Sequence, residues 1–82
     1  MFSLSKKTDY GLMALGFLSH VGDRPVNSRE IAERYNIPAE LLAKIMQTLA
    51  REGLVLSFSG PKGGYQLARR PEEITVADVI RA

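Results

Sequence analysis

The chain of 82 residues contains no cysteine, no tryptophan and a single histidine, His20. The lack of cysteine excludes disulfides, thiolate nucleophiles and the usual zinc sites from these residues. His20 has no nucleophile to activate, and we interpret it as a partner for the dipole at the end of a helix. Redox or metal chemistry would therefore have to come from elsewhere.

Long apolar runs are also missing. The longest, from Gly11 to Leu18, is far shorter than the ~20 residues that span a bilayer, and no basic start leads into a signal core with a cleavage site. We expect a cytoplasmic protein that does not associate with membranes. The length suits one domain over residues 1–82, and 45% hydrophobic with 24% charged residues is typical of a folded globular chain.

Charge of one sign is only slightly in excess, with 11 basic against 9 acidic residues and a net charge of +2. This balance permits a nucleic-acid partner without requiring one. Whether the chain binds nucleic acid must therefore be judged from the positions of the charges.

Apolar residues at helical spacing predict a first helix from near Ser5 to Gly22. Its expected inward face is Tyr10, Met13, Ala14, Phe17, Leu18 and Val21. A second helix is expected to begin at Asn27, in a capping box with Glu30, and to turn Ile31 and Ala32 inward.

A very short turn links the second helix to a third, since Asn36 tolerates a positive φ and Pro38 suits the first position of a helix. The third helix should end at Gly53. Its expected inward stripe is Leu41, Leu42, Ile45, Met46 and Leu49. Its opposite stripe is Glu40, Ala43, Lys44, Gln47 and Arg51, which is either exposed to solvent or binds a partner.

Two extended runs, residues 54–59 and 65–68, flank a glycine-rich segment with one lysine and predict a β-hairpin. Thr75 and Asp78 then cap a last helix. Its apolar stripe, Val76, Val79 and Ile80, runs for fewer than two turns, so we expect the chain to be a fragment of a longer protein.

This order of elements predicts a mainly α fold with a β-hairpin, a winged helix-turn-helix. In that fold the third helix, about residues 38–52, enters the major groove of DNA, and the hairpin, about residues 54–68, follows the backbone or the minor groove. The alternative is that the three helices simply pack a core.

Specific residues extend this comparison over the whole chain. They are Thr8-Asp9-Tyr10-Gly11-Leu12, Ile31-Ala32, Ile37-Pro38 with Leu41 and Leu42, Leu49, Gly53-Leu54-Val55 and Gly60-Pro61-Lys62-Gly63-Gly64-Tyr65-Gln66-Leu67-Ala68. They resemble the winged-helix repressor family that includes the bacterial iron-sulfur cluster regulator, the nitric-oxide-sensitive repressor and the cysteine metabolism repressor. The Gly-x-x-Gly-Gly-Tyr-x-Leu wing is the most specific part.

The resemblance implies a cytoplasmic homodimer that binds a palindromic operator in double-stranded DNA. Many members hold an iron-sulfur cluster with three cysteines that follow the last helix seen here. Because this chain has no cysteine, we assign it no cofactor, and a cluster is an expectation for a longer form alone. The sensing part and the long dimerisation helix of the family are expected to lie outside residues 1–82.

The resemblance also implies a major-groove surface at the start of the third helix, made by Pro38, Ala39, Glu40, Ala43, Lys44 and Gln47. Lys44 suits guanine or a phosphate, Gln47 suits adenine, and Glu40 suits the amino group of cytosine. In the free protein an ion pair between Glu40 and Lys44 is the alternative for both side chains.

The wing of the family often has arginine just before the first glycine, where this chain has Ser59, which weakens the case for minor-groove reading. Lys62 is the substitute, and its alternative is a solvated lysine at the loop tip. The expected wing contacts are Ser59, Gly60, Lys62, Gly63 and Gly64. Expected phosphate contacts elsewhere are Ser5, Lys6, Lys7, Tyr10, Ser28 and Arg29, with ordinary surface residues as the alternative.

We therefore predict sequence-specific DNA binding by a bacterial-type transcription regulator, a repressor in its intact form. An enzyme is not expected, because residues 60–64 lack the spacing of a nucleotide-binding loop and join two strands. The alternative is a winged-helix protein-interaction module without DNA binding.

Overall fold

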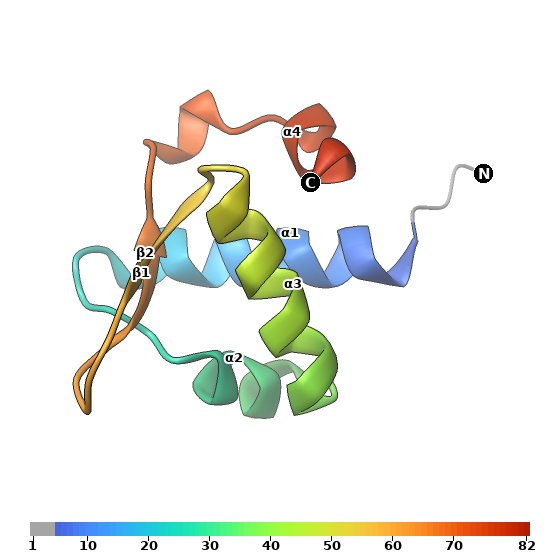
Figure 1. Cartoon of the computed structure of the whole chain (residues 1–82). Helices are drawn as coiled ribbons and strands as arrows, with labels where there is room; N and C mark the ends of the chain where they lie inside the picture. Colours follow the sequence, from blue (N-terminus) through green and yellow to red (C-terminus); the bar gives the residue numbers. More distant parts are fainter. Residues whose placement is uncertain (1–4) are drawn as a thin grey trace.

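The computed structural model describes residues 5–82 and has the predicted order of three helices, a hairpin and a helix (Figure 1). The elements are α1 (Lys6–Val21), α2 (Ser28–Tyr35), α3 (Ala39–Arg51), β1 (Val55–Phe58), β2 (Gly64–Leu67), the 3₁₀ turn η1 (Pro71–Glu73) and α4 (Val76–Arg81). None of the helices among residues 5–82 combines the length and the apolar composition that a membrane span requires.

Side-chain caps mark the starts of α1, α2 and α4, close to where the sequence predicts them. The side chains of Ser5 and Asn27 accept hydrogen bonds from the backbone N–H of Thr8 (3.2 Å) and Glu30 (2.8 Å), and Thr75 forms the predicted capping box with Asp78. Asn36 adopts the left-handed conformation, with φ 54°, and this produces the short turn between α2 and α3.

Two details of this capping differ from the prediction. Pro38 is the cap before α3 and not its first residue, because its ψ of 126° is extended. Glu30 does not return a hydrogen bond to the backbone of Asn27, because its carboxylate accepts from the guanidinium of Arg24. Asn27 therefore caps α2 by a single side-chain hydrogen bond, without the reciprocal bond of a capping box.

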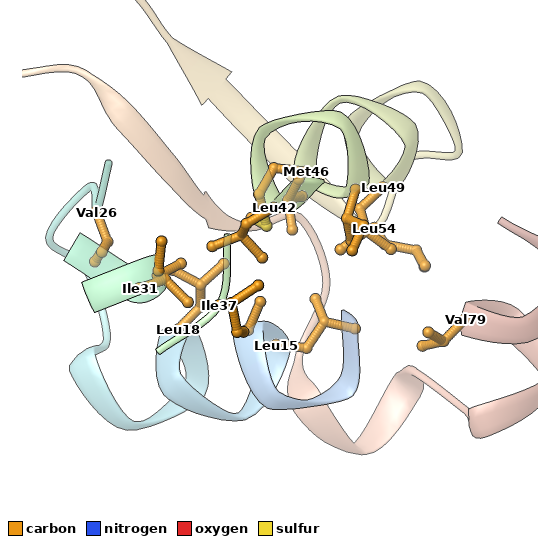
Figure 2. Packing of buried hydrophobic residues seen from close by; sticks show 14 residues of the cluster. Leu15, Leu18, Val26, Ile31, Ile37, Leu42, Met46, Leu49, Leu54 and Val79 are labelled. Atoms are coloured by element: carbon orange, nitrogen blue, oxygen red, sulfur yellow. The ribbon is translucent and has the colours of Figure 1, made fainter. Parts of the chain in front are cut away.

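The core lies where the first three helices and the start of the hairpin meet (Figure 2). Leu18, Ile31, Leu42, Met46, Leu49 and Leu54 are each at most 2% exposed. The predicted inward positions of α2 and most of those of α3 are confirmed. Val79 of α4 joins the same cluster.

Most of the predicted inward face of α1 is confirmed, because Ala14 and Leu18 are buried and Tyr10, Phe17 and Val21 pack against the core. Met13 is the exception, since it is 43% exposed, and the buried face is Thr8, Gly11, Ala14, Leu15 and Leu18. A Cβ on Gly11 would lie 3.3 Å from the Val79 side chain, so the small residues of α1 allow its neighbours to approach closely. On α3, Leu41 was also predicted to face inward and is instead 37% exposed.

The hairpin pairs antiparallel, with Val55 opposite Leu67 and Phe58 opposite Gly64. Its second strand is also joined to the α1–α2 turn, because Val26 and Tyr65 exchange two backbone hydrogen bonds of 2.9 and 2.8 Å. The side chain of Gln66 donates to the carbonyl oxygen of Asp23 in the same turn. These bonds hold the wing beside the turn that leads into α2 (Figure 1).

Candidate nucleic-acid interface

The starts of α2 and α3 lie together and share one shallow hollow. Its lining residues are Asn27, Ser28, Arg29, Ala39, Glu40 and Ala43. The first N–H groups of a helix have no partner within the helix, so the start of α2 presents donors to an anion beside α3. The structure thus brings the predicted contacts of both helices to one surface.

The outward stripe of α3 is accessible, as predicted. Glu40, Lys44 and Gln47 are exposed, while Ala43 between them is partly buried. Among residues 5–82, neither Glu40 nor Lys44 takes part in an ion pair, so the alternative of an intrahelical pair is not realised. These side chains are available to a partner along the face opposite the core.

The tip of the wing has a backbone that side chains would disrupt. A Cβ on Gly63 would overlap the carbonyl group of Phe58. Gly64 has φ 141°, and a Cβ there would lie 2.5 Å from the carbonyl carbon of Val26. Both positions therefore require glycine. Ser59, Gly60 and Lys62 are exposed at the tip.

A second hollow separates the wing tip from the α1–α2 turn and α2. One wall is Arg24, Pro25, Asn27 and Glu30, and the other is Pro61, Lys62 and Gly63. Asn27 lines both hollows, so the start of α2 lies between the outward stripe of α3 and the wing tip. In Figure 1 the wing tip, α2 and the start of α3 all lie at the lower end of the molecule.

The start of α1 is not part of either hollow. Figure 1 places it on the opposite side of α3 from the hairpin. Lys6 stacks over the ring of Tyr10 at 5.9 Å, and the ammonium of Lys7 donates to the carbonyl oxygen of Ala82 at 3.3 Å. Ser5 uses its hydroxyl within the α1 cap. These four predicted contacts thus form a separate group.

Acids neutralise some arginines and leave other cations free. Arg24 pairs with Glu30, Arg70 with Glu73 and Arg81 with Asp78. Among residues 5–82 no ion pair involves Arg29, Lys44 or Lys62, which lie on α2, α3 and the wing. The lower end of the molecule therefore keeps cations that can meet phosphates.

Hydrogen bonds hold two carboxylates in their charged form. The guanidinium of Arg24 lowers the pKa of Glu30, and the backbone N–H of Thr75 lowers the pKa of Asp78. The Arg24–Glu30 pair is therefore charged at neutral pH.

Arg24 is not among the contacts predicted from the sequence. Its position in the second hollow depends on a hydrogen bond to Glu30, six residues later, and no helical or strand period links such a pair.

Comparisons with known proteins confirm the resemblance. The family model Rrf2, described as an iron-dependent transcriptional regulator, matches residues 4–82. An HTH-type transcriptional regulator of Aquifex aeolicus is 45% identical over 71 residues, which cover 87% of this chain and 49% of that protein. This chain thus spans about half the length of the curated relatives it matches.

Solved structures of two regulators have the same fold. CymR, the global cysteine regulator of B. subtilis, aligns with a TM-score of 0.90 at 35% identity and covers 99% of this chain and 64% of that chain. IscR of T. potens aligns with a TM-score of 0.86 at 41% identity, over 98% of this chain and 59% of that chain. With a family match over nearly its whole length, the chain belongs to the Rrf2 family of winged-helix transcriptional regulators.

Proposed function

We propose that this chain binds double-stranded DNA with α3 in the major groove. The observation that carries the proposal is the common surface of α2, α3 and the wing, where exposed polar side chains of α3 adjoin the start of α2. In helix-turn-helix proteins the second helix of the motif, which is α3 here, contacts the bases, and the first, which is α2 here, contacts the DNA backbone. Arg29 in the first hollow and Lys62 in the second would then each contact a phosphate, with Asn27 lying between the two hollows.

The start of α1 would add phosphate contacts beyond α3. Lys6 and Lys7 are the first residues of α1, and the start of α1 lies across α3 from the wing (Figure 1). Contacts at the start of α1 and on the wing would therefore flank α3. Contacts of this kind fix the register of a protein on DNA without reading sequence. For Lys7 this requires release from the carbonyl of Ala82.

Lys44 and Gln47 should determine base preference. Replacing either by alanine is expected to cost ~1–3 kcal/mol against the preferred site if it makes a bidentate base contact, and much less against random DNA. The measurement is the ratio of affinities for a site selected from a random duplex pool and for the pool itself. Melting temperatures should barely change, since both side chains are exposed.

Arg51→Ala is the matched control, because Arg51 lies on the same stripe but is the last residue of α3, at the end of that helix away from α2 and the wing tip (Figure 1). Its affinity ratio should equal that of the parent chain. An unchanged ratio in both Lys44→Ala and Gln47→Ala would show that this face of α3 does not read bases.

Lys62 should contribute affinity whatever the DNA sequence. Log affinity is expected to fall with log salt at ~0.9 per phosphate neutralised, so Lys62→Ala should reduce this slope by about one. Titration of mixed-sequence duplex at several salt concentrations measures it. A slope equal to the parent's would mean that Lys62 is a solvated loop-tip lysine.

A protein-interaction module is the second candidate. It is favoured by Leu56 and Phe58, which are 49% and 42% exposed on β1. Because counterion release makes phosphate binding depend on salt, a flat salt response of the parent chain would reject DNA binding in favour of this alternative.

The properties of the intact regulator extend this proposal. One recognition helix reads few bases, and helix-turn-helix proteins gain specificity by binding two half-sites as dimers, so we propose a homodimer on a palindromic operator. Repression in the cytoplasm, without enzymatic activity, is the corresponding role. With no cysteine in the chain and no cluster of metal-ligating side chains among residues 5–82, these residues do not fit an iron-sulfur cluster.

A further inference from the structure

The hollow between the wing tip and the α1–α2 turn has a cation on each wall. Arg24 lies on the wall that leads into α2, and Lys62 lies on the wing. The carboxylate of Glu30 shares the hollow with them. The two cations outnumber the acid, so the hollow favours an anion.

Glu30 holds the Arg24 guanidinium in a fixed orientation. Nη1 and Nη2 of Arg24 donate to the two carboxylate oxygens at 3.2 and 3.0 Å, which is a bidentate pair. A guanidinium has five N–H donors, so three remain when two are used in this way. Arg24 is still 56% exposed, and these remaining donors are accessible from solvent.

The wall that carries Arg24 is also joined to the wing. Val26 exchanges two backbone hydrogen bonds with Tyr65, and Gln66 donates to Asp23. The chain before and after Arg24 is therefore fixed to β2, while Glu30 fixes its side chain to α2. Such a site is preformed, so binding there needs little ordering of the protein.

From this geometry we propose that Arg24 and Lys62 together bind one stretch of the DNA phosphodiester backbone that enters this hollow. Arg24 is then a further phosphate contact of the interface, and Glu30 is its positioning residue. The inference rests on the proposed DNA binding and adds a contact to it. An arginine suits the role because its planar fork matches phosphate oxygens while the carboxylate holds its other edge.

The test is the salt dependence of binding to mixed-sequence duplex DNA, because a phosphate contact does not depend on sequence. Arg24→Ala is expected to reduce the slope of log affinity against log salt by ~0.9, the value for one phosphate. The variant R24A/E30Q should show the same reduced slope. Removing the acid does not restore a contact that the arginine itself makes.

Arg70→Ala is the matched control. Arg70 is also an exposed arginine in an ion pair, with Glu73 at 3.4 Å, and it lies beside η1 at the end of the molecule away from the wing tip (Figure 1). It loses the same charge, and its slope should equal the parent's. A helical circular dichroism spectrum equal to the parent's checks that each variant is folded.

Two results would overturn the inference. One is a slope of log affinity against log salt in Arg24→Ala that equals the slope of the parent chain. The other is recovery of the parent's affinity and slope in R24A/E30Q, which would mean that Arg24 merely screens the charge of Glu30. Both are separate from failure of the proposed function, in which the parent chain itself would show no salt-dependent binding to DNA.

Discussion

Replacing Leu49 by alanine is expected to cost about 2–5 kcal/mol of unfolding free energy. Leu49 is 2% exposed and belongs to the cluster that joins α1, α2 and α3 to the start of the hairpin. The truncation removes buried apolar surface and leaves a cavity that the neighbouring helices fill incompletely. For a domain of this size, each kcal/mol corresponds to roughly 4–8 °C in melting temperature.

Leu41→Ala provides a matched control on the same helix. Leu41 is 37% exposed, so the same change of side chain should destabilise the chain much less. Thermal and denaturant unfolding of the two variants measure the difference. Equal losses would contradict the observed orientation of α3.

Leu49→Ala should also weaken DNA binding in a way that the surface variants do not. It lowers the folded fraction, so affinity for a preferred site and for random DNA should fall by the same factor. Lys44→Ala and Gln47→Ala should change the ratio and leave melting unchanged. A shift of the affinity ratio in Leu49→Ala would mean that the core side chain influences the reading face directly.

Local sequence signals predicted the helix boundaries because the caps act over three or four residues. Ser5, Asn27 and Thr75 each bond to a backbone N–H three residues later, which is a relation that sequence spacing encodes. Asn36 at a positive φ is equally local. The helix boundaries and the order of the elements could therefore be predicted from these residues.

Faces of helices were harder to predict, because neighbouring elements decide which side is covered. α1 approaches α3 and α4 over its small residues, with Gly11 between Val79 and Ile45, and the larger Met13 is left outside. A hydrophobic period counts Met13 and ignores glycine. Met13 was predicted to face inward because a hydrophobic period assumes that the large apolar side chains are the buried ones, whereas close packing of helices also uses small residues.

The hollow between the wing tip and the α1–α2 turn could not be predicted, because it depends on contacts between residues far apart in the sequence. Val26 meets Tyr65 and Asp23 meets Gln66 across some forty positions of the chain. The sequence indicated a glycine-rich hairpin with a lysine, and the positions of Gly63 and Gly64 within it. It contained no sign that the α1–α2 turn supplies the opposite wall.

That opposite wall explains why Gly64→Val should have a large effect on DNA binding. A side chain at position 64 meets the Val26 backbone at 2.5 Å and must also adopt φ 141°, a strained conformation that costs about 1–3 kcal/mol by itself. The strand is expected to separate from the turn, because the clash lies next to the two hydrogen bonds between Val26 and Tyr65.

The three helices should survive this change, because the atoms nearest to the added Cβ are backbone atoms of Val26 and Asn27, which lie outside α1, α2 and α3, although Val26 itself belongs to the buried cluster. Gly64→Val is therefore expected to retain the helical circular dichroism of the parent and to lose the wing's share of binding, a fall of about one or two in the salt slope. Gly16→Val is the matched control, because Gly16 lies on α1 with nothing within 4 Å of its Cβ position, and it should keep both helicity and binding. Binding by Gly64→Val that equals the parent's in affinity and slope would remove the wing from the DNA interface, and with it the phosphate site between Arg24 and Lys62. Loss of helicity in Gly64→Val would instead mean that the wing and its turn are needed to hold the core together.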